Sequence, residues 1–174
     1  MNLDKWKLAA NVHLRILMQD APEPATSTFS GIANLTTNKV TGQIAIPNFT
    51  VPIKIIGLPF PTGMSIQPAA DMSGSVSLDN AGQLHMHGSV PMNITITSLL
   101  GIPMGQCKMV APVVFPLDFD GPISSLGNGG LTFKGSTTFP QIKGCPLAPI
   151  FSTLVAGSGQ TFAFTVSPPA PVGN

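Results

Sequence analysis

His85 and His87 are the residues of this sequence best placed to do chemistry. They lie two positions apart in a stretch that alternates apolar and polar residues, and side chains two apart on a strand point to the same face. Two imidazoles on one face could bind a divalent metal, with His13 or Asp79 arriving from elsewhere as a third ligand. Two ligands do not complete a site, and a solvated polar face is the simpler interpretation. We therefore predict no metal and no cofactor.

Catalytic motifs are missing from the sequence. It has no Tyr, three His, and Glu23 as its only glutamate, with no nucleophile elbow, phosphate-binding loop or HExxH zinc motif. A Ser-His-Asp set stays open, but no spacing selects one. Catalysis needs a positioned acid, base or nucleophile, usually with a perturbing neighbour. We therefore predict that the protein is not an enzyme.

The two cysteines, Cys107 and Cys145, form an even pair. Secreted β-proteins commonly join such a pair in one disulfide, which would stabilise the fold by about 3–4 kcal/mol in the chain-entropy model. Two buried free thiols are the alternative. The start Met1–Asp4 has no signal-peptide pattern, and we expect a mature chain from which an export signal has been removed. Together these features predict a secreted, cell-envelope or outer-membrane location.

Charged residues are scarce. They make up 9% of the chain, against about 25% in ordinary globular proteins, while hydrophobic residues reach 43%. Either Ser, Thr, Asn and Gln solvate the surface, or part of it meets another protomer, a lipid or a wall polymer. A net charge of +1 argues against a nucleic-acid partner.

Period-two alternation dominates the chain and predicts an all-β fold. From 84 to 96 the even residues are apolar, apart from a glycine, and the odd residues are mostly polar, which is typical of one long strand. Residues 72–78 form its expected hairpin partner. The same pattern predicts further strands at 29–35, 40–46, 49–55, 109–119 and 162–166. A short C-terminal helix is expected over about 147–155, ending before Gly157.

A duplication organises the strands into units of about 44 residues. Ile55-Ile56-Gly57-Leu58-Pro59 closes one β-meander and Leu99-Leu100-Gly101-Ile102-Pro103 closes the next. Such units predict a β-sandwich or barrel. The expected organisation is an amphipathic segment (1–20), a linker (21–26), a β domain (27–167) with repeats at about 27–70, 71–112 and, more weakly, 131–167, and a tail (168–174).

The first twenty residues alternate over an unusually long run. The apolar positions predicted to contact membrane or another protomer are Trp6, Leu8, Val12, Leu14, Ile16 and Met18. The polar or lumen-facing positions are Lys5, Lys7, Asn11, His13 and Arg15. Such a strand could cross a lipid layer if several protomers closed a barrel. An ordinary long strand in the main sheet, or an amphipathic helix, are the alternatives.

Several short phrases carry a resemblance to a known group. They are Ile56-Gly57-Leu58-Pro59, Leu100-Gly101-Ile102-Pro103, residues 139–146 and residues 157–164. With these phrases the chain resembles, over about residues 27–167, secreted and cell-envelope β-proteins of high-GC Gram-positive (mycolate-type) bacteria. The resemblance implies a lipid-rich outer envelope as the setting and brings no catalytic motif.

We predict a non-enzymatic, oligomeric cell-envelope protein that contacts lipid. It would form a tunnel or pore, or bind apolar envelope molecules, and its partners would be copies of itself and an outer-envelope lipid or amphiphile. The adaptable, Met-rich apolar faces support this prediction. A structural or adhesive surface module is the alternative, and a soluble lipid carrier is a third.

Overall fold

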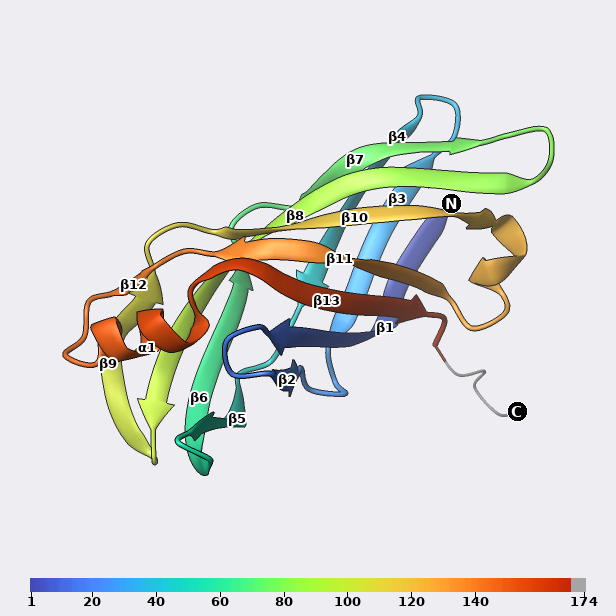
Figure 1. The fold of residues 1–174 in the computed structure, drawn as a ribbon. Coiled ribbons are helices and arrows are strands. Elements are labelled where there is room, and N and C mark those ends of the chain that lie inside the picture. The colour runs from blue at the N-terminus through green and yellow to red at the C-terminus, as the bar shows by residue number, and fades with distance from the viewer. Residues whose placement is uncertain (170–174) are drawn as a thin grey trace.

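The computed structural model describes residues 1–169 and shows an all-β protein with one short α-helix (Figure 1). Within these residues, thirteen antiparallel strands belong to one sheet. The all-β prediction is confirmed. Of the tail predicted at 168–174, residues 170–174 lie outside the described part.

The elements follow one another along the chain with short connections. In order they are β1 (Asn2–Leu14), β2 (Gln19–Pro22), β3 (Thr28–Asn34), β4 (Lys39–Ala45), β5 (Phe49–Ile55), β6 (Leu58–Pro68), β7 (Met72–Leu78), β8 (Gln83–Leu99), β9 (Ile102–Met109), β10 (Val113–Pro122), a 3-10 turn (Ile123–Leu126), β11 (Leu131–Phe139), β12 (Ile142–Lys143), α1 (Ala148–Val155) and β13 (Gly157–Ser167).

Eight strands form a rolled sheet that we call the main body. Their order is β11, β13, β1, β3, β4, β7, the first half of β8, and β10. The sheet curls until its two ends meet, because β10 lies beside β11 (Figure 1). No backbone ladder joins these two described strands, but the Thr137 hydroxyl donates to the Val114 carbonyl at 2.6 Å. The roll encloses the apolar faces, as a two-faced sheet must.

Strand β8 continues beyond the main body. Its first half pairs with β7 and β10, and its second half, from Met92 to Leu99, pairs with β6 and β9. We call the second half of β8, with β5, β6, β9, β12 and α1, the distal lobe. One strand therefore runs through both parts and fixes their relative position (Figure 1).

Alternation decides which side chains are inside. The apolar even positions of β8, namely Leu84, Met86, Val90, Met92, Ile94 and Ile96, are all buried. The odd positions are partly or fully exposed. The sequence pattern predicted this face correctly, since side chains alternate across a strand.

The N-terminal segment is an ordinary strand of the main body. β1 pairs with β13 along one edge and with β2 and β3 along the other. Leu8, Val12 and Leu14 are buried in the core, so in this fold they cannot reach a lipid surface as predicted. Trp6 packs against the same core from the edge, and a β-bulge with Lys5 at a φ of 51° interrupts the pairing beside it.

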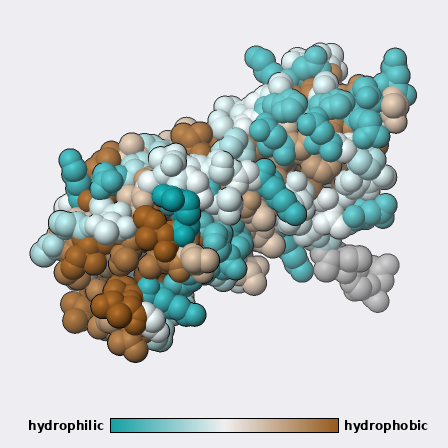
Figure 2. Space-filling view, viewed as in Figure 1, coloured by the Kyte–Doolittle hydropathy of each residue, from teal (hydrophilic) through white to brown (hydrophobic). Residues whose placement is uncertain are grey.

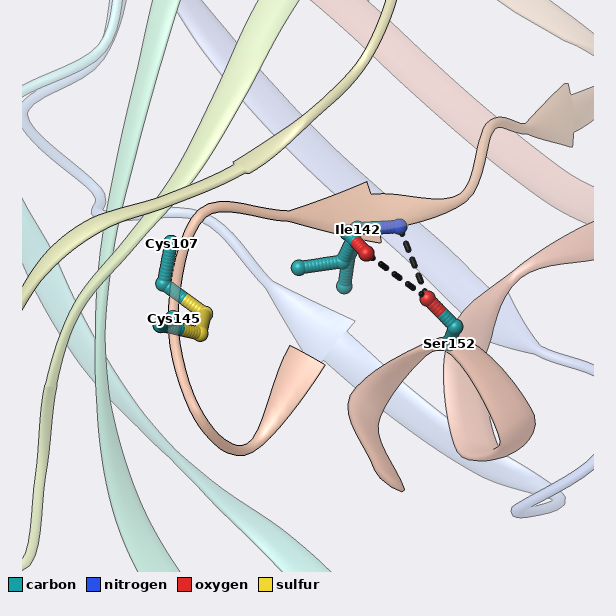
Figure 3. The surroundings of a disulfide bond; sticks show 4 residues. All are labelled: Cys107, Ile142, Cys145 and Ser152. Atoms are coloured by element: carbon teal, nitrogen blue, oxygen red, sulfur yellow. Dashed lines mark hydrogen bonds between the residues drawn. A yellow bond between two sulfur atoms is a disulfide. The ribbon is translucent and has the colours of Figure 1, made fainter. Parts of the chain in front are cut away.

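The predicted disulfide is present and holds the distal lobe together. Cys107 on β9 bonds to Cys145, three residues before α1, with an S–S distance of 2.05 Å (Figure 3). Ser152 of α1 adds a second tie, because its hydroxyl accepts the Ile142 N–H at 2.8 Å and donates to the Ile142 carbonyl at 3.1 Å. The helix is thus fastened to β12 and β9.

Candidate functional site

Two hairpins of the distal lobe end in the same unusual turn. Ile56-Gly57 joins β5 to β6, and Leu100-Gly101 joins β8 to β9, each as a two-residue loop. The backbone φ angles are 52° and 75° in the first turn and 53° and 78° in the second. Positive φ at both central positions is the signature of a type I′ turn. The two duplicated phrases of the sequence therefore fold into matching hairpin tips.

The first residue of each tip is of a type that rarely adopts the backbone conformation found there. Type I′ turns favour Asn or Gly there, and a bulky or β-branched residue in the left-handed region is uncommon and strained. Ile56 nevertheless occupies this position with 97% of its surface exposed, and Leu100 occupies the equivalent one with 55% exposed. Neither side chain gains burial within the chain that would offset the strain.

Both tips lie at the same end of the molecule, and the second tip contacts the first hairpin (Figure 1). The Leu100 N–H donates to the Pro61 carbonyl of β6 at 2.8 Å, which ties the second tip to the first hairpin. Leu58 and Ile102, the residues after each turn, are 63% and 65% exposed. We call Ile56, Leu58, Leu100 and Ile102 the tip patch. Figure 2 shows a brown apolar region at this end of the molecule, where Figure 1 places both tips.

The segments that build the distal lobe carry charges of one sign. The segments 47–70, 92–117 and 138–156, which build the distal lobe, contain Lys54, Lys108 and Lys143 and no Asp or Glu. All three lysines are exposed. Lys108 and Lys143 are directly opposite each other on β9 and β12, an arrangement that costs stability for like charges.

An apolar cavity of about 60 Å³ lies where the distal lobe meets the main body. Its walls come from β1, β2, β5, β6, β8, β9, β10, β12, α1 and the end of β11. They include Val12, Leu14, Ala21, Phe49, Val51, Ile53, Met64, Ile66, Ile94, Ile96, Met109, Phe115, Phe139, Ile142, Phe151 and Val155. Among its lining residues only Glu23 carries a charge.

Glu23 is a half-buried residue with one carboxyl oxygen that is enclosed and has no hydrogen-bond partner. Its Oε2 is enclosed and makes no hydrogen bond among the described residues. Burial raises its pKa from the usual 4.5 to about 7, and a hydrogen bond to its own backbone offsets this in part. The residue lies in the segment predicted as a linker, but the Glu23 N–H donates to the Ala10 carbonyl of β1 at 2.9 Å.

The predicted histidine pair lies at the other end of the molecule, beside the β7–β8 turn (Figure 1). Strand β10 places an aspartate opposite each histidine, so that His85 Nδ1 is 2.6 Å from Asp120 and His87 Nδ1 is 3.1 Å from Asp118. The bond to Asp120, and then the one to Asp79, raise the pKa of His85. The sequence suggested Asp79, which is 3.5 Å from His85 Nε2, but did not reveal the β10 register.

This cluster does not have the geometry of a catalytic or metal site. Ser77 and Ser75 are cross-strand neighbours of His85 and His87, which sets up two Ser-His-Asp rows. The remaining nitrogen of each histidine, however, faces a second carboxylate, Asp79 or Asp120, and not a serine. Among residues 1–169 no group of three or more metal-ligating side chains has metal-binding geometry.

His13, the other predicted metal ligand, is far from this cluster in the sheet. It faces Asp20 across the β1–β2 hairpin, with its Nδ1 3.0 Å from the carboxylate. The hydrogen bond between Asp20 and His13 lowers the pKa of Asp20, and a hydrogen bond from Asn11 lowers it further. The polar residues predicted to line a lumen lie on the outer side of β1 or in the turn after it. Lys5, Lys7 and Arg15 are exposed, and Asn11 and His13 are half-buried.

Two predicted contact residues do reach the surface. Ile16 and Met18, in the turn between β1 and β2, are 46% and 82% exposed. The tip patch was missed as a site, although its phrases Ile-Gly-Leu-Pro and Leu-Gly-Ile-Pro were recognised as a repeat. Two apolar residues in place of the usual Asn of a hairpin turn were the available signal.

None of the helices within residues 1–169 combines the length and hydropathy needed to span a membrane. Comparisons with protein-family models, with curated proteins and with solved structures give no match.

Proposed function

We propose that this is a non-enzymatic binding protein of a lipid-rich cell envelope, which holds a single alkyl chain between its distal lobe and its main body. The observation that supports the proposal is an apolar cavity lined by one carboxyl with an unpaired oxygen. Binding sites for small molecules are typically apolar, with few polar groups that fix orientation. An alkyl chain would suit the walls, and a hydroxyl-type head group would pair with Glu23.

The size of the cavity restricts the ligand. Its 60 Å³ is smaller than the apolar void of about 150 Å³ that admits benzene in an engineered protein. Any ligand would therefore have to displace side chains of the wall. A thin unbranched chain would need less displacement at each point along its length than a ring. Met64 and Met109 in the wall can supply that movement, because the methionine side chain is unbranched and has three rotatable bonds.

A calorimetric titration with 1-decanol tests the proposal. We expect saturable binding by the wild-type protein and its loss in Ala21→Leu, which fills part of the cavity. Ile56→Asn, outside the cavity, should bind like the wild type. Absence of saturable binding by the wild type, or equal binding by Ala21→Leu, would refute the proposal.

Export and self-association belong to the proposal as well. The disulfide supports an oxidising compartment, since such bonds are rare in the cytosol. Light scattering on the purified protein would test the predicted oligomer. A tunnel through one chain is not proposed, because side chains such as Met72, Leu84 and Val90 fill the main body.

A further inference from the structure

We infer that the tip patch inserts into the surface of an anionic lipid layer and docks the protein on it end-on. This inference adds to the proposed function the surface that makes lipid contact. It depends on the envelope setting of that proposal and is independent of the cavity.

The choice of residues at the tips supports the inference. An exposed Ile or Leu in the left-handed region is strained, and an Asn would largely avoid this strain. Ile56 and Leu100 both carry this cost, at equivalent positions of two hairpins that lie together. A lipid layer would offset this cost by burying both apolar side chains.

Few backbone groups at the two turns would have to be desolvated when the tips enter a lipid layer. Unpaired N–H and C=O groups are costly in a lipid layer, so an inserted segment must satisfy its own backbone or lack donors. Two-residue turns leave few groups unpaired, since Ile55 pairs with Leu58 and Leu99 pairs with Ile102 directly across each turn. Pro59, Pro61 and Pro103 beside the tips have no N–H to desolvate.

The charge of the distal lobe selects an anionic lipid over a protein or a neutral lipid surface. Lys54 lies two residues before Ile56, and the opposed pair Lys108 and Lys143 is exposed on the same lobe. A lysine near an anionic membrane is attracted to it, and the lobe segments contain no carboxylate to oppose this attraction.

Flotation with vesicles tests the inference. We compare the full chain with its Ile56→Asn/Leu100→Asn variant on phosphatidylglycerol and phosphatidylcholine vesicles. We expect the wild type to bind the anionic vesicles more strongly and the double variant to partition at least about tenfold more weakly. Because Asn suits both turns, the variant should unfold at the same or a higher temperature, so lost binding cannot be assigned to misfolding.

Ile32→Thr is the matched control. Ile32 lies on β3 of the main body, away from the tips, and is 60% exposed, comparable to Leu58 and Ile102. Its loss should leave vesicle binding unchanged. Equal binding by the wild type and the tip variant would overturn the inference. So would a wild type that ignores vesicles and instead self-associates through the tips, seen as a dimer that the tip variant converts to a monomer.

The two proposals fail separately. Ala21→Leu should lose decanol and keep vesicle binding, whereas the tip variant should lose vesicle binding and keep decanol. The decanol titration contains no vesicles. A tip variant that lost decanol binding as well would therefore show that the tips and the cavity are not independent.

Discussion

The two ends of the molecule differ in how polar and apolar side chains are distributed on their surfaces. At the histidine end, the polar groups pair with one another, as in His85–Asp120 and His87–Asp118, and the neighbouring apolar side chains Leu84 and Met86 are buried. At the tip end, Ile56 and Ile102 are exposed, and the segments that build the distal lobe contain lysines but no Asp or Glu. The polar pairs of the histidine end suit a surface in water, whereas the exposed apolar tips are the surface for which we propose a lipid partner.

Reducing the disulfide should have the largest effect on this contrast. Opening Cys107–Cys145 removes a loop constraint that contributes about 3–4 kcal/mol to the free energy of unfolding. Urea unfolding measured with and without reductant should show this decrease in the free energy of unfolding. Hydrogen exchange should rise in β9, β12 and α1 and change little in β7 and the first half of β8. An equal rise of hydrogen exchange in all strands would show that the distal lobe does not unfold separately from the main body.

The pH dependence of Glu23 should be the next largest effect. Its pKa is about 7 in the folded protein against 4.5 ordinarily, so its contribution to stability is complete below 4.5 and is lost as pH rises to 7. The loss amounts to up to about 3 kcal/mol. Urea unfolding across this range should show the decline in the wild type and in Asp71→Asn, an exposed control. Glu23→Gln should not show it, and a decline of equal size in that variant would contradict the burial argument.

The smallest effect is expected at the histidine end. Asp120→Asn should lower the pKa of His85, because the Asp120 hydrogen bond is the main cause of its raised value. An NMR titration of the histidine ring protons measures this directly. Asp71→Asn, whose carboxylate contacts Gln43 and no histidine, should leave the titration of His85 unchanged. An unchanged pKa in Asp120→Asn would mean that the pair is not formed in solution.

Alternation predicted most of the fold, because the positions of Leu84, Met86 and Val90 on one face follow from strand geometry alone. The disulfide and the C-terminal helix were also predicted from local signals. Pairing between distant strands was not, since periodicity within a strand does not say which strand lies beside it. The opposition of Asp118 and His87 depends on such a register, as does the meeting of the two tips.

Glu23 and Leu8 show the same limit at the level of single residues. Prolines on both sides of Glu23 indicated a linker, yet the fold covers it with β1 and the distal lobe. The apolar residues of the first strand suggested a lipid-facing side, but the rolled sheet encloses them. In both cases the sequence showed the type of surface, and the tertiary fold decided what covers it.

The length of β8 has a geometric consequence. Its 17 residues, at about 3.3 Å each, span roughly 55 Å from the tip end to the histidine end. A molecule standing on its tips would hold the aspartates and histidines of β8 and β10 far above the lipid head groups, well beyond the Debye length of about 8 Å in physiological salt. Those groups would then experience the pH and ions of the surrounding fluid and not those of the membrane.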